Sequence, residues 1–172
     1  MSDPHPEDRD ADPESVARAI LLRQLTLGRK SRHQLATKLR ERNVPEEAAE
    51  AVLERFEEVG LVDDAEFAAL WVSSRSGAKA LSRSALRREL ATKGITGAPA
   101  EEALATVSMD EEDDAARLLV ERRRREVPAD DRAAIDREVR RLVGMLARKG
   151  HSPGRAFRIV SEVLGSDSVN TR

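Results

Sequence analysis

A short sequence pattern recurs three times along this chain of 172 residues, at intervals of roughly 50 residues. In each copy, a segment with leucines four residues apart ends in a cation followed by Asn or Gly, at Arg42–Asn43, Lys93–Gly94 and Lys149–Gly150. Asn and Gly tolerate the left-handed conformation that ends a helix, and a cation suits the negative end of the helix dipole. The recurrence predicts an array of repeats, each of which buries its apolar face partly against its neighbour.

Each copy contains signals for three helices. In the first copy, Pro13 opens a helix, Ser31 with Gln34 forms a capping box, and Pro45 starts a third helix that Gly60 ends. The expected helices span about 13–27, 31–42, 45–59, 63–76, 82–93, 99–107, 110–126, 135–146 and 152–163. We therefore predict an all-α fold of three tandem three-helix repeats, which form an elongated, curved array of right- or left-handed twist.

The domain organisation follows from these repeats. We expect repeat 1 over 14–62, repeat 2 over 63–108 and repeat 3 over 109–165. Residues 1–13 form an acidic segment with little to bury, so we expect a disordered tail there and a second disordered tail over 166–172.

Composition excludes several classes of protein. The chain has no Cys, which excludes disulfide frameworks, thiol nucleophiles and Cys-ligated metals. Three Phe, one Trp and no Tyr argue against a β-sandwich or barrel and against an aromatic platform that stacks bases. No apolar run approaches the ~20 residues of a membrane span, so we expect a cytoplasmic protein that does not act at a membrane.

Charge alternates along the chain although the net charge is only −2. Residues 15–43 carry eight Lys or Arg against one acid, whereas 44–70 carry nine acids against one base. Similar basic blocks cover 71–94 and 137–158, so the chain can present basic surface to a polyanionic partner. The alternative is that these cations lie on helix faces that contact only water. The candidate basic surface comprises Arg29, Lys30, Arg32, Lys79, Arg83, Arg87, Arg88, Arg140, Arg148 and Arg155.

Nothing in the sequence indicates catalysis, and we predict no catalytic residue, metal or cofactor. Asp63 is explained as a helix cap with Glu66, and no third metal ligand lies nearby. The histidines, His5, His33 and His151, have no metal-site spacing. The segment that begins at Gly28 lacks the first Gly of a phosphate-binding loop.

These residues also carry a resemblance to a known family. Residues 31–68, SRHQLATKLRERNVPEEAAEAVLERFEEVGLVDDAEFA, resemble the first repeat of the bacterial RecX family of RecA regulators. LRRELATKGI at 86–95 and LARKGHSPGRAFRIVSEVL at 146–164 are similar to its later repeats, so the resemblance covers about 14–165. The sequence departs from the family pattern at Asn43, where Gly is common, and at His151, where an aromatic residue often follows Gly.

The resemblance implies a regulator, usually an inhibitor, that binds the RecA filament on single-stranded DNA and acts in recombination and DNA repair. We expect a monomer that makes at most weak direct contact with DNA. Two other classes stay open at this stage. One is a DNA-binding helix-turn-helix protein that uses the turn at 28–30 and the helix at 31–42. The other is a helical-repeat scaffold that binds proteins without DNA.

Overall fold

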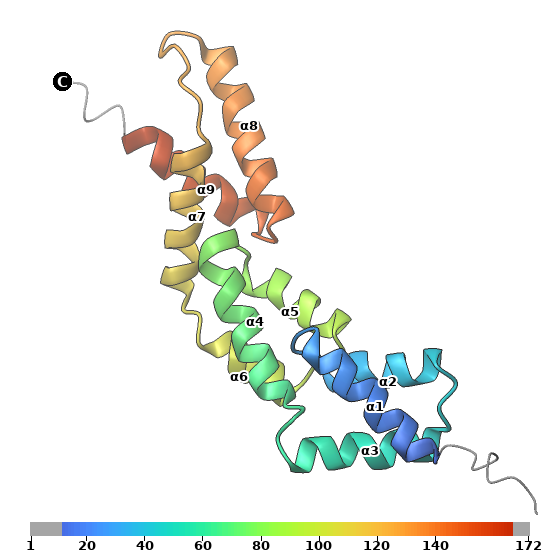
Figure 1. The fold of residues 1–172 in the computed structure, drawn as a ribbon. Helices are drawn as coiled ribbons and strands as arrows, with labels where there is room; N and C mark the ends of the chain where they lie inside the picture. Colours follow the sequence, from blue (N-terminus) through green and yellow to red (C-terminus); the bar gives the residue numbers. More distant parts are fainter. Residues whose placement is uncertain (1–11, 167–172) are drawn as a thin grey trace, which may run out of the picture. The chain divides into compact units, whose positions relative to one another are not determined.

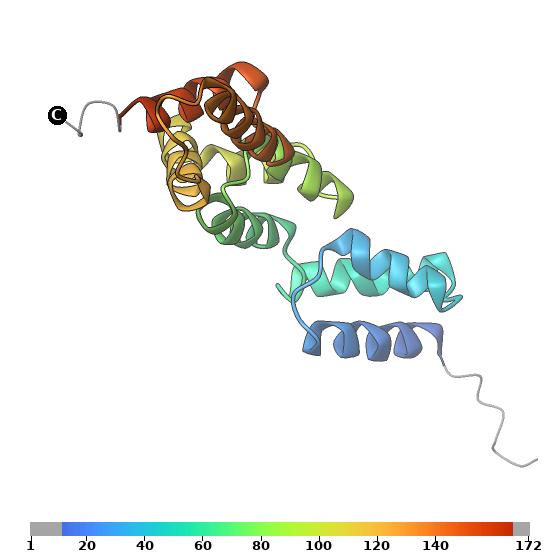
Figure 2. The same ribbon diagram turned by 90° about the horizontal axis from the view of Figure 1, so that it is seen from above.

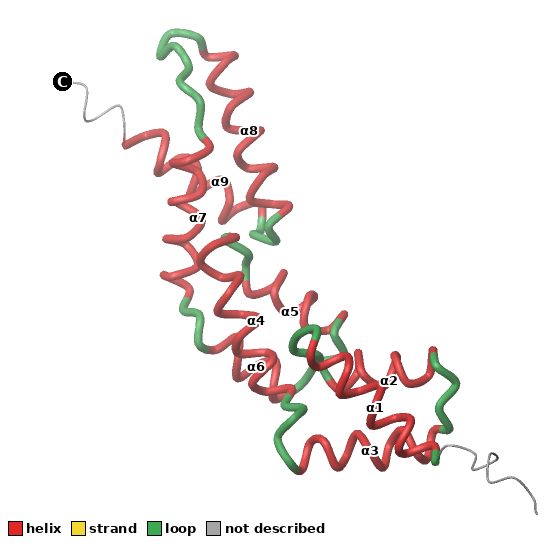
Figure 3. Tube along the Cα trace, in the orientation of Figure 1, coloured by secondary structure: helices red, strands yellow, loops and turns green. Residues whose placement is uncertain are grey.

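The computed structural model describes residues 12–166, and in that range every regular element is a helix (Figures 1 and 3). The prediction of an all-α fold is therefore confirmed. The helices are α1 (Pro13–Thr26), α2 (Arg32–Glu41), α3 (Glu46–Glu58), α4 (Asp64–Lys79), α5 (Arg83–Thr92), α6 (Ala98–Ala105), α7 (Met109–Arg123), α8 (Arg132–Arg148) and α9 (Pro153–Ser166). The two tails that we predicted to be disordered lie largely outside the described residues. Asp12 caps α1 by accepting a hydrogen bond from the Ser15 N–H, and Pro13 is the first residue of that helix.

The described chain divides into two compact units. Unit 1 runs to Phe67 and includes the short segment Lys93–Ile95, and unit 2 contains residues 68–92 and 96–166. In unit 1, the helices α1, α2 and α3 pack against one another (Figure 2). Their core contains Leu21, Leu35, Leu39 and Leu53, all with fully buried side chains.

Unit 2 has its main core where α7 and α8 pack on α9. This core contains Leu142, Leu146, Ile159 and Val160, which have no solvent exposure. Within the same unit α5 packs on α6, and Leu86, Leu90 and Leu104 are buried there. The leucines that recur four residues apart in the sequence are therefore core residues.

The recurrent cation–Asn/Gly pairs end helices as predicted. Asn43, Gly94 and Gly150 all have left-handed backbones, with φ of 56°, 74° and 90°. The carbonyl groups just before the two glycines accept hydrogen bonds from serines at equivalent repeat positions. Within unit 1, Ser31 Oγ donates to the Lys93 carbonyl at 2.6 Å, and within unit 2 the Ser82 N–H donates to the Lys149 carbonyl at 3.0 Å. The repeated pattern thus forms contacts between segments far apart in sequence, as well as helix ends.

Capping follows the sequence signals. The predicted capping box is present at Ser31 and Gln34, and Asp63 Oδ1 accepts from the Glu66 N–H at 2.9 Å. A second capping box, at Ser108 and Glu111, begins α7 at Met109. These bonds satisfy N–H groups that have no partner inside the helix.

Helix α7 ends at Arg123, three residues before the predicted end at Glu126. Arg124 is extended, and the Arg125 N–H donates to Glu138 Oε1 of α8 at 2.9 Å instead of to a helical carbonyl. Glu138 is buried, and hydrogen bonds from Arg141 lower its pKa by more than burial raises it. This tertiary contact has no signature in the local sequence of α7.

None of the helices in residues 12–166 combines the length and apolar character that crossing a bilayer requires.

Candidate interaction surface

The ten predicted basic-surface residues fall into two groups. Five form ion pairs with carboxylates of the chain, namely Arg29, Arg32, Arg83, Arg87 and Arg155. The other five form no ion pair with any residue between 12 and 166, namely Lys30, Lys79, Arg88, Arg140 and Arg148. Sequence reasoning cannot separate the groups, because the carboxylate partners mostly lie on other helices.

Arg32 joins the start of α2 to α3. Its Nη2 lies 2.6 Å from Glu50 Oε2, and its Nε lies 3.1 Å from Glu57 Oε2. The hydrogen bond to Glu50 makes the largest contribution to raising the Arg32 pKa. Its backbone N–H donates to Asp64 Oδ1 at 2.9 Å, and burial is the main cause of the raised pKa of Asp64. The side chain is 30% exposed, and its two ion pairs connect α2 to α3.

Arg87 makes a similar link between α5 and α6. Its Nε and Nη2 donate to the two carboxylate oxygens of Glu101 at 2.7 and 2.8 Å, a bidentate geometry. The hydrogen bond from Arg87 lowers the Glu101 pKa. Arg29 likewise pairs with Glu66 at 2.6 Å. The positive charges of Arg29 and Arg87 are therefore offset by carboxylates of the chain itself.

Arg155 lies inside an ionic cluster between α9 and α7. Its side chain is 17% exposed and contacts Glu112, Asp113 and the Met109 carbonyl. The side chains of Glu112 and Asp113 are only 5% and 12% exposed. Burial alone would raise the Asp113 pKa, but hydrogen bonds from Arg158 and Arg155 outweigh it and the pKa is lowered. The structure thus places Arg155 among internal carboxylates.

His151 borders the same cluster and is buried. Its Nε2 lies 2.9 Å from the Ala80 carbonyl, to which it donates. Its Nδ1 lies 3.6 Å from Glu112 Oε1 and has no hydrogen-bond partner among residues 12–166. A polar pocket of about 330 Å³ lies here, between the starts of α5 and α9. Its cations Arg83, Arg87 and Arg155 all have carboxylate partners, so its positive charge is largely offset.

The unpaired group comes from several helices. Lys30 precedes α2, Lys79 ends α4, Arg88 lies on α5, and Arg140 and Arg148 lie on α8. All but the half-buried Lys30 are exposed, and the Arg88 guanidinium donates to the hydroxyl of Ser84 at 3.1 Å. No carboxylate of the described chain therefore pairs with any of these five cations.

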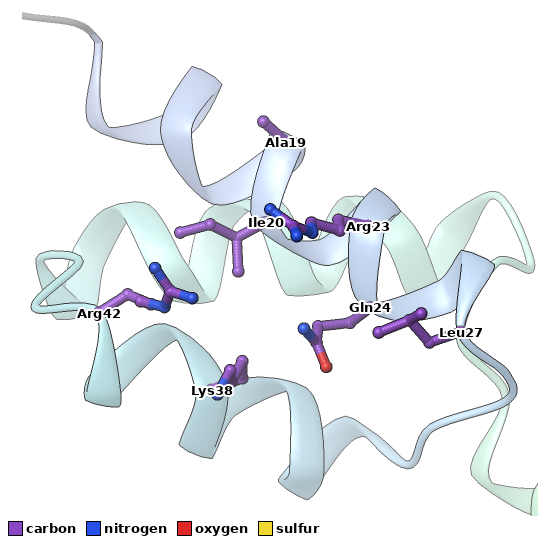
Figure 4. A pocket seen from close by; sticks show the side chains of 7 residues that line it. All are labelled: Ala19, Ile20, Arg23, Gln24, Leu27, Lys38 and Arg42. Carbon is purple, nitrogen blue, oxygen red and sulfur yellow. The ribbon is translucent and has the colours of Figure 1, made fainter.

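Sequence reasoning missed a basic groove between α1 and α2. The groove has a volume of about 360 Å³ and is bordered by side chains of both helices (Figure 4). Its lining residues are Ala19, Ile20, Arg23, Gln24, Leu27, Lys38 and Arg42. Arg42 also has the helix-end position that its place before Asn43 predicts. The sequence signal for the groove is the spacing of Ile20, Arg23 and Leu27 along one helix face, with Lys38 and Arg42 four residues apart.

No group of three or more His, Cys, Asp or Glu suited to a metal ion occurs among residues 12–166. Asp63 and Asp64 contact backbone N–H groups of Glu66 and Arg32, which explains this acidic pair without a ligand.

Comparisons with known proteins identify relatives over most of the chain. The family descriptions "RecX, first three-helix domain" and "RecX, second three-helix domain" match residues 17–56 and 63–104. "Regulatory protein RecX" of Streptomyces coelicolor is 49% identical over 160 residues, which is 93% of this chain and 84% of that protein. The protein of the same name from Thermobifida fusca is 44% identical over 167 residues, 95% of this chain and 89% of the relative.

Two solved structures share the fold. The crystal structure of RecX from Lactobacillus salivarius superposes with a TM-score of 0.73 at 20% identity and covers 89% of this chain and 97% of that one. A second crystal structure, of a regulatory protein RecX, gives a TM-score of 0.74 at 24% identity over 88% of this chain and 74% of that one. With the identity to the Streptomyces and Thermobifida proteins over nearly its whole length, the chain belongs to the RecX family of regulatory proteins.

Proposed function

We propose that this protein binds the RecA recombinase filament on single-stranded DNA and reduces its activity in recombination and DNA repair. The observation that carries the proposal is the 49% identity to a regulatory protein RecX across 93% of the chain. As part of the same proposal, the protein acts in the cytoplasm as a monomer and catalyses no reaction. Helices that carry separated, unpaired cations are suited to a polymer that contains DNA phosphates.

The contact surface is best assigned to the unpaired cations, Lys30, Lys79, Arg88, Arg140 and Arg148. A cation that already has a carboxylate partner must lose that partner, or share it, to bind a phosphate. The unpaired cations carry no such cost, so they contribute more to binding. Arg29, Arg32, Arg83, Arg87 and Arg155 mainly stabilise the fold.

Charge reversal tests this assignment. The variant Lys79→Glu, Arg88→Glu, Arg148→Glu should bind the filament about tenfold more weakly and inhibit RecA ATP hydrolysis in proportion. If three phosphate contacts are lost, the slope of log affinity against log salt should flatten by about 2. The matched control is Arg55→Glu, Arg117→Glu, Arg132→Glu, which reverses three solvent-accessible cations that each already pair with a carboxylate of their own helix.

The control should bind within about twofold of the parent, and both variants should keep the parent's helical circular dichroism and melting temperature. An equal loss of filament affinity in the two variants would mean that binding depends on net charge alone, and would contradict the assignment. Full inhibition by the first variant, when it is folded, would place the contact on other surfaces.

A further inference from the structure

The groove between α1 and α2 combines two kinds of surface that neither helix offers alone. Its apolar part is formed by Ile20, which is partly buried against the core of unit 1, and by Leu27, which is 72% exposed. Its cationic part is formed by Arg23 of α1, Lys38 of α2 and Arg42, the residue that follows the last residue of α2 (Figure 4). Both helices belong to unit 1 and share the buried core around Leu21 and Leu39, so the groove has a preformed frame.

Two of the three cations that line the groove form no ion pair with the described residues. Arg23 and Arg42 form no ion pair with residues 12–166, whereas Lys38 donates to Glu41 at 2.9 Å. The adjoining, buried side of α1 packs into the core through Ala17 and Leu21. The exposed Leu27 thus lines one groove together with two arginines that form no ion pair with the described residues, and apolar surface bordered by charge is typical of an interaction site.

The apolar and cationic residues that line the groove together indicate which kind of ligand it binds. Single-stranded DNA would pair with the cations, but its bases stack on aromatic side chains, and the groove has none. An amphipathic acidic helix uses both features, because its apolar face covers Ile20 and Leu27 while its carboxylates pair with Arg23 and Arg42. The acidic segment 1–11 of this chain is complementary in charge to the groove. Its apolar residues are only Met1, Pro4, Pro6 and Ala11, so it offers no apolar helix face to cover Ile20 and Leu27.

We propose that the groove between α1 and α2 is a docking site for an acidic amphipathic helix of a partner protein. The proposal does not require that partner to be the recombinase, so it stands or falls separately from the function proposed above.

A fluorescent peptide tests the proposal on the full-length protein. The probe is a synthetic helix of about 18 residues with Leu at helical spacing on one face and Glu on the other. Fluorescence anisotropy should give a Kd below about 100 µM, and a scrambled peptide of the same composition should bind about tenfold more weakly. Equal binding of the scrambled peptide would overturn the proposal, because charge alone would then explain it.

Variants locate the site. Arg23→Glu with Arg42→Glu should weaken binding about tenfold, and Leu27→Ser about threefold. The matched pair Arg18→Glu with Arg40→Glu reverses exposed cations of the same two helices that do not line the groove, and should stay within about twofold. Arg23→Ala with Arg42→Ala replaces the reversal if the melting temperature falls. Equal losses in the two pairs would overturn the proposal.

Two further arms exclude the other occupants. Unlabelled oligo-dT should not displace the peptide, and displacement that depends on Arg23 and Arg42 would make the groove a nucleic-acid site instead. A chain that lacks residues 1–11 should bind the peptide within about twofold of the parent. An affinity gain of about tenfold would show that the chain's own acidic segment occupies the groove, and would overturn the assignment to a partner.

Discussion

Replacing Arg155 by Ala should destabilise the protein by about 3–5 kcal/mol, because it leaves the buried carboxylates of Glu112 and Asp113 without their shared guanidinium. Arg158 still pairs with Asp113, and Arg83 lies 3.7 Å from Glu112, but neither reaches both carboxylates as Arg155 does. Urea denaturation followed by circular dichroism at pH 7 measures the loss. The control Arg140→Ala removes an exposed cation without an ion pair and should change stability by less than about 0.5 kcal/mol.

The deficit of Arg155→Ala should also shrink as pH falls. In the parent the Asp113 pKa lies below its ordinary value, so the stability it contributes is present above that value and is lost as pH falls through the lowered pKa. In the variant, burial without Arg155 favours the neutral form of Asp113, so its protonation relieves part of the destabilisation. Neutralising the pair by Glu112→Gln with Asp113→Asn should likewise restore part of the stability. A constant deficit between pH 7 and pH 4 would contradict the ionic account of this cluster.

Gly150→Ala should cost about 2–4 kcal/mol, from two separate causes. Its φ of 90° is strained for any residue with a Cβ, and that Cβ would lie 2.5 Å from Ser82 Oγ and 2.7 Å from Ala85 Cβ. Two control glycines separate the causes. Gly60 has a φ of 73° but open space around it, and Gly154 has neither a positive φ nor a close neighbour.

The expected order of destabilisation is Gly150→Ala, then Gly60→Ala at about 1–2 kcal/mol, then Gly154→Ala near or below zero. Denaturant midpoints of the three variants give this order directly. Equal losses at Gly150 and Gly60 would mean that the close approach between Gly150 and the start of α5 contributes nothing.

The fold was largely predictable because its signals are local. Leucine spacing, the Ser31–Gln34 capping box and the positive-φ residues Asn43, Gly94 and Gly150 all act within one helix or turn. The predicted end of α7 was wrong because Glu138, a residue of α8, accepts the hydrogen bond from the Arg125 N–H. No pattern in the sequence around Arg125 records a partner that lies 13 residues away on another helix.

The basic surface was less predictable than the fold. Charge blocks located the cations, but whether a cation is available depends on carboxylates brought near it by folding. Arg32 and Lys30 are two residues apart, yet Arg32 meets Glu50 and Glu57 while Lys30 meets no carboxylate of the described chain. The groove at Arg23 and Arg42 was missed because its two arginines come from different helices and are separated by 19 positions in the sequence.

The most direct test of the proposed function is a titration of the protein against three targets under one salt condition: labelled duplex DNA, single-stranded DNA, and RecA-coated single-stranded DNA. Co-sedimentation of the coated strand reports binding, and RecA ATP hydrolysis reports inhibition. We predict that the RecA-coated strand binds at least about tenfold more tightly than either bare DNA and that inhibition follows occupancy. Equal affinity for bare and RecA-coated strands, or tightest binding to the duplex, would contradict the account and favour a direct DNA-binding protein.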